Sequence, residues 1–216
     1  LIPMCAKYLT GLIGAPIAPS AAPAMHEAAG DAVGVRCHYQ LIEVAGADAA
    51  TLRALLDGVR RLGFAGVNVT FPYKEAVIPL LDELSPDART IGAVNTVVVR
   101  DGRLVGYNTD SSGFARAIGD LVAGSKHGAV ALIGAGGVGK AIAFALASLG
   151  IAGLNIFDAD RVKAEALSSQ LQGRLKARVT DDVAGALEGV VGVVNGTPVG
   201  MLPDRGMAVQ DALLHG

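Results

Sequence analysis

One lysine and one aspartate stand where predicted strands end, and both are suited to moving protons. Lys74 follows the apolar stretch 66–70 and a proline, and Asp110 closes the run Asn108-Thr109-Asp110. A lysine whose pKa is tuned by a partly buried site and a nearby carboxylate can take the proton of an alcohol while a hydride leaves the carbon. The two residues are therefore a candidate acid–base pair. Taken singly, Lys74 also fits a first-turn helix charge, and Asp110 also fits a helix N-cap.

Amide and hydroxyl side chains occur at the same expected strand ends. They are Asn68, Thr70, Asn95 and Thr109. In open parallel sheets, ligands bind outside the carboxyl ends of the strands. Because amides and hydroxyls can both donate and accept hydrogen bonds, their convergence suits a substrate with several hydroxyl groups.

The stretch GAGGVG at 134–139 satisfies the pattern G-x-G-x-x-G. It follows an apolar strand and opens a helix, and Asp158 lies 19 residues after Gly139 at the end of the next expected strand. Small residues let a pyrophosphate approach the helix N-terminus, where free N–H groups favour anions. The residues expected to bind a dinucleotide are Gly134, Ala135, Gly136, Gly137, Val138, Gly139 and Asp158.

Asp158 bears on which dinucleotide is preferred. Its carboxylate can accept hydrogen bonds from ribose hydroxyls but would repel a 2′-phosphate, so NAD is favoured over NADP. Arg161 and Lys163 follow closely and would weaken this discrimination. The alternative is a tight structural turn in which Asp158 only caps the next helix.

Short apolar runs alternate with helical patterns along the whole chain. Strands are expected over 9–14, 38–44 and 66–70, with a hairpin over 93–110 that turns at Asp101-Gly102. Helices are expected over 23–34, 48–63, 74–84 and 112–124. A second series has strands over 129–137, 153–160 and 190–201, and helices over 140–150 and 161–171. The alternation predicts an α/β protein with a substrate-binding and catalytic domain over 1–124 and a Rossmann-type dinucleotide-binding domain over 125–216.

Composition narrows the class of protein further. Of 216 residues 51% are hydrophobic but only 4% aromatic, which suits a core of aliphatic side chains in helices packed on a parallel sheet. A net charge of −2 without a basic stripe argues against nucleic acid as a partner. No apolar run reaches 18 residues, so no membrane segment is expected. The two cysteines and four histidines have no metal-ligand spacing, and a cytoplasmic protein without a metal is expected.

Six motifs occur in an order that resembles the shikimate dehydrogenase family, and most closely its NAD-using quinate/shikimate branch. They are GLIGAPIAPSAAPAMHEA, GVNVTFPYK, IGAVNT, GYNTDSSGF, GAGGVGKA and NGTPVGM. The resemblance implies reversible hydride transfer at C3 of shikimate or quinate, giving 3-dehydroshikimate or 3-dehydroquinate. The expected partner is a small hydroxylated cyclic carboxylate, the expected cofactor is NAD or else NADP, and the expected assembly is a monomer or homodimer.

The resemblance also implies roles for single residues. Lys74 and Asp110 match the family's catalytic pair, and Thr197 and Pro198 match a loop that lines the nicotinamide. The residues that match the family's substrate-binding motifs are Ser20, Ala22, Asn68, Thr70, Asn95 and Thr109. Lys163 is added to the cofactor-binding set because it follows Asp158 closely.

Two departures from the family pattern matter. Ala22 stands where the family carries a second hydroxyl residue for the substrate carboxylate, and losing that hydrogen bond would cost roughly 1.5–3 kcal/mol, or about ten- to a hundredfold in binding. The chain also stops at DALLHG, before the family's C-terminal segment, which is therefore expected to be missing. Ala22 leaves open a weakly active or non-catalytic dinucleotide-binding relative with an altered substrate. A methylene-tetrahydrofolate dehydrogenase is a third reading, against which the motifs NVTFPYK and NTD weigh.

Overall fold

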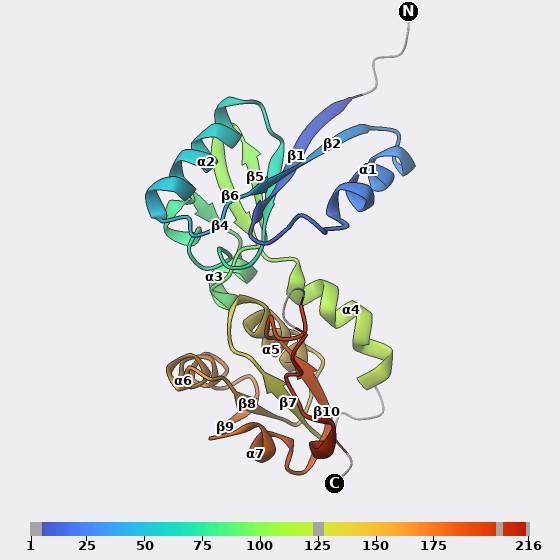
Figure 1. Cartoon of the computed structure of the whole chain (residues 1–216), viewed down its shortest axis with the longest axis vertical. Coiled ribbons are helices and arrows are strands. Elements are labelled where there is room, and N and C mark those ends of the chain that lie inside the picture. Colours follow the sequence, from blue (N-terminus) through green and yellow to red (C-terminus); the bar gives the residue numbers. More distant parts are fainter. Residues whose placement is uncertain (1–5, 123–127, 202–204, 215–216) are drawn as a thin grey trace, which may run out of the picture. The chain divides into compact units, whose positions relative to one another are not determined.

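The computed structural model describes residues 6–122, 128–201 and 205–214. The chain divides into two compact units, Leu1–Thr109 and Asp110–Gly216, each built around its own β-sheet (Figure 1). The expected α/β class is confirmed. Among the described residues, no helix has both the length and the apolar character needed to cross a bilayer.

The first unit contains a six-stranded sheet in the order β2-β1-β3-β5-β6-β4. Its strands are β1 (Lys7–Gly14), β2 (Arg36–Glu43), β3 (Gly66–Val69), β4 (Glu83–Leu84), β5 (Thr96–Arg100) and β6 (Arg103–Tyr107). Its helices are α1 (Ala22–Ala32), α2 (Ala49–Arg61), the 3₁₀ helix η1 (Ile78–Leu80) and α3 (Pro86–Ile91). Strand β1 is parallel to β2 and β3, whereas β5 is antiparallel to β3 and β6. The sheet is therefore mixed, and the start of β5 lies at the same edge as the ends of β3 and β6.

The hairpin between β5 and β6 is confirmed at the predicted turn. Asp101 and Gly102 have φ values of 51° and 74°, the left-handed conformation that two-residue hairpin turns of this kind require at both positions. Glycine adopts it without steric cost, and aspartate is among the few other residues that tolerate it.

The two faces of the first sheet have different partners, because side chains alternate along each strand. One face packs against α2 in an apolar core that includes Ile13, Val67, Val69 and Val97 from the sheet and Leu52, Leu56 and Val59 from the helix. On the other face, Leu12 and Tyr39 pack with Ala22 at the start of α1 (Figure 1). Asn68 pairs with Leu12 in register and Thr96 pairs with Asn68, so these polar side chains share the second face.

The segment that follows β3 differs from the prediction. Instead of an α-helix over 74–84, the chain forms turns, the short helix η1 and the two-residue strand β4. Pro79 lies inside η1, and proline lacks the N–H that an α-helix interior needs. Lys74 therefore lies in a turn and not in the first turn of an α-helix.

The second unit contains a four-stranded, fully parallel sheet in the order β10-β7-β8-β9. Its strands are β7 (Ala129–Ile133), β8 (Gly153–Phe157), β9 (Lys176–Val179) and β10 (Val190–Asn195). Its helices are α4 (Asp110–Val122), α5 (Gly137–Ser148), α6 (Arg161–Gln170), α7 (Val183–Leu187) and the 3₁₀ helix η2 (Asp211–Leu213). Helix α4 packs against α5 and so belongs to the second unit. The predicted domain boundary at 124 and 125 lies outside the described residues.

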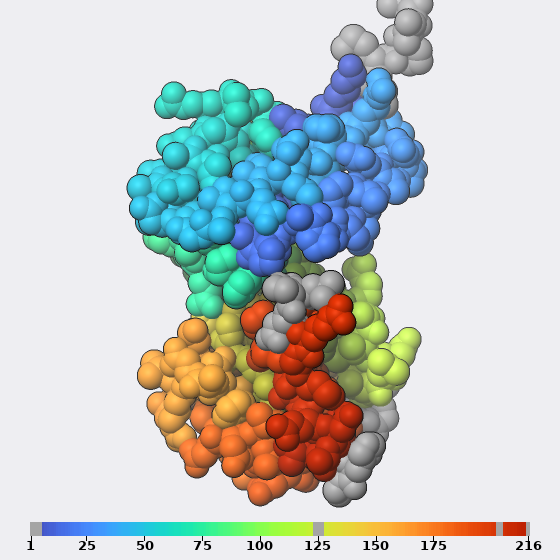
Figure 2. Space-filling view, in the orientation of Figure 1, coloured from blue at the N-terminus to red at the C-terminus, as the bar shows by residue number. Residues whose placement is uncertain are grey.

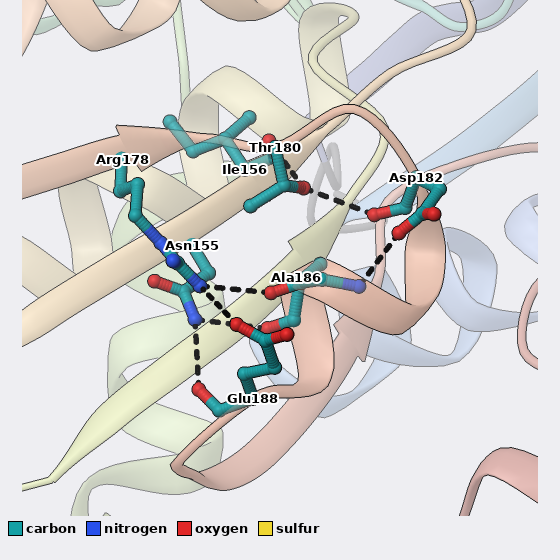
Figure 3. Close-up of polar contacts among 8 residues, drawn as sticks. Asn155, Ile156, Arg178, Thr180, Asp182, Ala186 and Glu188 are labelled. Atoms are coloured by element: carbon teal, nitrogen blue, oxygen red, sulfur yellow. Dashed lines mark hydrogen bonds and ion pairs between the residues drawn. The ribbon is translucent and has the colours of Figure 1, made fainter.

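A buried asparagine attaches α7 to the second sheet (Figure 3). Asn155 on β8 is only 7% exposed, and its Nδ2 donates to the carbonyls of Ala186 at 3.0 Å and Glu188 at 3.2 Å. Arg178 on β9 donates to the Gly185 carbonyl at 2.9 Å. The last carbonyls of a helix have no partner within the helix, so these side chains satisfy groups that would otherwise be unpaired.

Figure 2 shows described residues of β10 and the segments after it (red) on the visible face of the second unit. Near the end of the described chain, Ala208 and Val209 pack against the core formed by Ala131, Ile133 and Ala186.

Candidate active site

The side chains of Asn68 and Asn95 are joined by a hydrogen-bond network at one edge of the first sheet. Nδ2 of Asn68 donates to the Asn95 carbonyl at 3.3 Å and to Thr96 Oγ1 at 3.1 Å. Thr96 Oγ1 donates in turn to Asn95 Oδ1 at 3.0 Å. Two of the amides expected to bind substrate are therefore brought together, through a threonine that the sequence analysis did not single out.

Thr109 joins the same network. Its N–H donates to Asn95 Oδ1 at 2.9 Å, and its Oγ1 accepts from Asn95 Nδ2 at 2.8 Å. Asn95 itself is 9% exposed, so its amide is fixed inside the protein while Thr109 lies at the surface. Asp110 follows directly in the chain as the first residue of α4, in the second unit.

Lys74 lies beside this network through its backbone. Its carbonyl accepts from the Val94 N–H at 2.8 Å, and Val94 precedes Asn95. The preceding residue, Tyr73, is buried, and its hydroxyl donates to the Val44 carbonyl at 2.6 Å and accepts from the Ala47 N–H at 2.9 Å. The turn that carries Lys74 is therefore anchored from both sides, and the lysine is half-buried.

Thr70 ends the strand segment that leads to Lys74. Its N–H donates to the Ile13 carbonyl at 2.9 Å, and its carbonyl accepts from the Tyr73 N–H at 2.9 Å. A Cβ on Gly14 would overlap the Thr70 methyl group, so β1 can approach Thr70 this closely only with glycine at its end.

Ser20 and Ala22 lie at the start of α1. Ser20 Oγ accepts from the Ala22 N–H at 3.2 Å, which leaves the serine hydroxyl proton to be donated elsewhere. Helix α1 has no side-chain cap and no acidic residue in its first turn. The positive end of the helix dipole and the Ser20 hydroxyl proton therefore suit an anion better than a cation at this helix end.

The glycine loop between β7 and α5 is built so that backbone approaches backbone. Gly134 has φ of 101°, a conformation that side chains rarely adopt. A Cβ on Gly139 would overlap the Gly134 carbonyl oxygen, and one on Gly134 would lie 2.7 Å from the Thr197 methyl group. A Cβ on Gly136, the residue before α5, would meet nothing within 4 Å. The backbone is therefore tightly packed at Gly134 and Gly139, whereas the space beside Gly136, at the uncapped N-terminus of α5, is open. An open space at a helix N-terminus fits a pyrophosphate.

Asp158 is tied to this loop by its side chain. Its Oδ2 accepts from the Ala135 N–H at 2.6 Å, and its Oδ1 accepts from the Asp160 N–H at 2.8 Å. Asp160, and not Asp158, is the N-cap of α6, because its Oδ1 accepts from the Val162 N–H at 3.1 Å. The interpretation of Asp158 as a helix cap is therefore wrong, and its carboxylate instead faces the glycine loop.

The cations that follow Asp158 are bound to carboxylates. Arg161 forms ion pairs with Glu165, at 2.7 Å, and with Asp181, and these hydrogen bonds raise the pKa of its guanidinium. Lys163 lies 3.7 Å from Asp160 Oδ2. Val138 and Lys163 are both exposed, so neither is fixed in the loop by packing.

Thr197 and Pro198 lie in a compact turn after β10. Asn195 Oδ1 accepts from the Thr197 N–H at 2.9 Å and from Thr197 Oγ1 at 2.6 Å, while its Nδ2 donates to the Val199 carbonyl at 3.0 Å. The Gly196 N–H donates to the Ile133 carbonyl at 2.7 Å, which brings the turn beside the glycine loop. Asn195 organises this turn and was missed from sequence, although an asparagine before glycine is a common turn signal.

Two family models match the chain. Residues 12–97 match the substrate-binding domain of shikimate dehydrogenase, and residues 119–179 match the ThiF family. The first match covers the strands and turns that carry Asn68, Lys74 and Asn95, and the second covers the glycine loop and Asp158.

Individual relatives are similar over nearly the whole chain. A shikimate dehydrogenase (NADP⁺) of Pseudarthrobacter chlorophenolicus is 42% identical over 97% of this chain and 74% of its own length. A quinate/shikimate dehydrogenase (NAD⁺) of Corynebacterium efficiens is 42% identical over 96% of this chain and 76% of its own length. The solved structure of quinate dehydrogenase from Corynebacterium glutamicum in complex with NAD has a TM-score of 0.82 and 40% identity, over 96% of this chain and 76% of that chain.

Proposed function

Because this chain belongs to the shikimate dehydrogenase family, a family of NAD(P)-dependent oxidoreductases, we propose that it transfers a hydride between NAD and C3 of shikimate. The reaction is reversible, with 3-dehydroshikimate as the ketone, and quinate with 3-dehydroquinate is a second substrate pair. The main support for the proposal is that one hydrogen-bond network connects Asn68, Asn95 and Thr109 beside the turn that contains Lys74.

In the oxidation, two bonds break at the same carbinol group. The C3–H bond breaks as a hydride leaves for the nicotinamide, which is the chemistry that NAD supplies. The O–H bond breaks as Lys74 Nζ, in its uncharged form, takes the proton, and a C=O bond forms. Asp110 is the proposed counter-charge for the resulting ammonium, because an opposite charge favours the charged form of a lysine.

The substrate's polar groups are distributed over the remaining residues of the first unit. Ser20 and the N-terminus of α1 receive the carboxylate, and the amides and hydroxyls receive the ring hydroxyl groups; these are Asn68, Thr70, Asn95 and Thr109. The support for this arrangement is that Asn95 and Asn68 are held by internal hydrogen bonds before any ligand arrives, which lowers the ordering cost of binding.

Ala22 is expected to limit binding of the carboxylate. We predict that Ala22→Ser, which restores a hydroxyl next to Ser20, lowers KM for shikimate by roughly tenfold, as expected for one hydrogen bond to a charged group. Steady-state kinetics at saturating NAD measure this, and Ala24→Ser, at an exposed position two residues further along, is the control. An unchanged KM would mean that the missing hydroxyl does not limit binding and that another group holds the carboxylate.

NAD is the proposed cofactor because acidic groups dominate the surroundings of Asp158. Arg161 and Lys163 are the two cations, and the carboxylates that face them or the loop are Asp158, Asp160, Glu165 and Asp181. A 2′-phosphate would meet an excess of negative charge there, and the two cations are already engaged. Thr197 and Pro198 line the nicotinamide side in this arrangement, and the loop residues 134–139 hold the pyrophosphate.

Asp158→Asn tests this cofactor assignment. We expect the ratio of kcat/KM for NAD to that for NADP to fall by about tenfold or more, because a like-charge repulsion is removed while one oxygen still accepts from Ala135. Glu188→Gln, which neutralises an exposed carboxylate paired with Arg178, is the control. A ratio that does not move would show that Asp158 acts on the loop alone and not on cofactor choice.

The substrate proposal itself is tested by steady-state turnover of the full-length protein. NADH formation is followed with shikimate and with quinate at high concentration, and both reactions are repeated with NADP. We expect turnover of shikimate with NAD. Absence of turnover with either acid and either cofactor would overturn the substrate assignment and favour a relative that binds a dinucleotide without this activity.

A further inference from the structure

The side-chain amide of Asn68 has a single orientation compatible with its neighbours. One end of the amide faces the backbone carbonyl of Asn95, which carries no proton and can only accept. Nδ2 must therefore point to Asn95, and Oδ1 points to the hydroxyl of Tyr39, 2.7 Å away. Because Oδ1 can only accept, Tyr39 must be the donor in this hydrogen bond.

Tyr39 is held in place for this role by α1. The residue is 4% exposed, its ring stacks on that of His26 with centroids 4.5 Å apart and planes 26° from parallel, and its N–H donates to Glu27 Oε1 at 3.1 Å. Burial, together with the nearby Cys37, raises the pKa of the Tyr39 phenol to about 12. The hydroxyl therefore keeps its proton at neutral pH and remains a donor.

The direction of the hydrogen bonds is passed on from Asn68. Thr96 Oγ1 accepts from Asn68 Nδ2, so its own proton goes to Asn95 Oδ1. The same oxygen accepts the Thr109 N–H, so Nδ2 of Asn95 is the end that donates to Thr109 Oγ1. Two backbone groups, the Asn95 carbonyl and the Thr109 N–H, thus determine which way the amides face, and the Tyr39 hydroxyl on β2 supplies the donor that holds the oxygen end of Asn68.

The geometry of the sheet explains how the Tyr39 hydroxyl reaches Asn68, although the two residues are 29 positions apart in the sequence. Tyr39 pairs with Thr10 on β1, while Asn68 pairs with Leu12 on the same strand. Residues 10 and 12 of β1 point to one face, so a long side chain on β2 reaches over β1 to β3. Tyrosine has this reach and carries its donor at the tip.

We propose that Tyr39 is a positioning residue of this active site, whose hydroxyl holds the oxygen end of the Asn68 amide and so completes the network that keeps Asn68 and Asn95 in place for the ring hydroxyls of the substrate. This inference rests on the proposed function, because it assigns those two amides to substrate binding. Tyr39 itself need not touch substrate. With this hydroxyl removed, Asn68 Oδ1 loses its donor, and the amide is held through Nδ2 alone, by the Asn95 carbonyl and Thr96 Oγ1.

Tyr39→Phe tests the inference, because it removes one oxygen and keeps the ring that stacks on His26. We expect KM for shikimate to rise about tenfold, because an Asn68 amide that is no longer held by its oxygen must be ordered when the substrate binds. We expect kcat to change less than about threefold and KM for NAD to stay the same, since Lys74 and the glycine loop are untouched. A general loss of folded protein would instead lower the apparent kcat and leave KM for shikimate unchanged.

Tyr73→Phe is the matched control for stability. Tyr73 is also 4% exposed, and its hydroxyl also makes two hydrogen bonds, but these go to Val44 and Ala47 and not to a site amide. Because this hydroxyl anchors the turn that carries Lys74, the control is compared by Tm and KM and not by kcat. It is expected to lower Tm at least as much as Tyr39→Phe without raising KM for shikimate. If both variants raise this KM equally, the effect is one of stability and the inference is overturned.

Thr96→Val breaks the same chain of hydrogen bonds at its next link. Alone it is expected to raise KM for shikimate like Tyr39→Phe, and the double variant is expected to resemble either single one. Two effects that multiply in the double variant would contradict a shared chain. If Tyr39→Phe folds poorly, Thr96→Val is a second test of the inference. An unchanged KM for shikimate in Thr96→Val overturns the inference by itself.

Failure of the proposed function and failure of the role of Tyr39 give different results. If the wild-type protein turns over neither acid, the proposed function is what has failed. If the wild type is active on shikimate and Tyr39→Phe has the wild-type KM, the proposed function stands and the role of Tyr39 is refuted.

Discussion

Lys74→Met is expected to lower kcat for shikimate oxidation by about a hundred- to ten-thousandfold, the usual contribution of a positioned general base or acid. Methionine keeps the length of the side chain but has no group that can take the alcohol proton. The hydrogen bond from Val94 goes to the backbone carbonyl of residue 74 and is preserved. The affinity for NAD should therefore remain within about twofold of the wild-type value, since the loop that binds it is built from other residues.

Rapid measurement of NADH formation at saturating substrate gives kcat, and calorimetric titration gives the affinity for NAD. Lys7→Met is the control, because Lys7 is an exposed lysine of the same unit at the start of β1. Activity of Lys74→Met within a few fold of the wild type would remove Lys74 from proton transfer. A parallel loss of NAD affinity would point to a misfolded unit.

Gly139→Ala is expected to weaken NAD binding by more than about tenfold and to lower the free energy of unfolding by roughly 1–3 kcal/mol, as overpacking does elsewhere. The added Cβ would overlap the Gly134 carbonyl oxygen and lie 2.8 Å from its carbonyl carbon. Both atoms are backbone, so neither can rotate away. Helix α5 must therefore move away from β7, and with it the N–H groups that receive the pyrophosphate.

Gly113→Ala is the matched control for this substitution. Gly113 is also a helical glycine of the second unit, in α4, and a Cβ there would meet nothing within 4 Å. Replacing it should stabilise the protein slightly, because alanine is the better helix former. Denaturant unfolding and NAD titration of both variants separate the effect of the overlap from that of helix propensity. Wild-type NAD affinity in Gly139→Ala would refute the close packing described for the loop.

The parts of the structure that local patterns determine were predictable from the sequence. Asp101-Gly102 marked its hairpin because few residue pairs accept two positive φ values. The glycine loop was predictable because an apolar strand, the glycine spacing and a following helix all occurred in order. The resemblance to a known family added the roles of Lys74 and Asp110, which the residues alone left open.

The errors arose where local patterns compete. The stretch 74–84 has apolar residues at helical spacing, yet Pro79 limits it to one turn of 3₁₀ helix. Helix α3 was missed although Ser85 caps it, accepting from the Ala88 N–H at 3.2 Å, and Pro86 opens it. A serine followed by proline is a recognisable helix start, but six residues are too few to show an apolar period.

The contacts that organise the candidate site were the least predictable. Tyr39 and Asn68 are 29 residues apart in sequence, and Ala135 and Asp158 are 23 apart. Such pairs depend on strand order and register, which a single sequence does not determine. The spacing of Asp158 indicated a cofactor contact, but only the fold reveals that its carboxylate also holds the glycine loop.

The internal hydrogen bonds of the site predict that the protein distinguishes between substrates with different hydroxyl patterns. Asn95 is fixed by Thr96 and Thr109 before a ligand binds, and it lies beside the turn of Lys74. A rigid set of donors and acceptors discriminates between hydroxyl patterns more sharply than an apolar pocket does, because a mismatch leaves buried polar groups unpaired. Shikimate and quinate, which differ in ring substitution, should therefore have clearly different kcat/KM values.

Transfer of an isotope from C3 of the cyclic hydroxy acid to the cofactor tests the proposed hydride transfer to NAD. The full-length protein is incubated with NAD and shikimate that carries deuterium at C3, and the reduced cofactor is analysed by mass spectrometry. We expect NADH to form and to carry the deuterium. NADH that forms without the label, or no NADH at all, would contradict it.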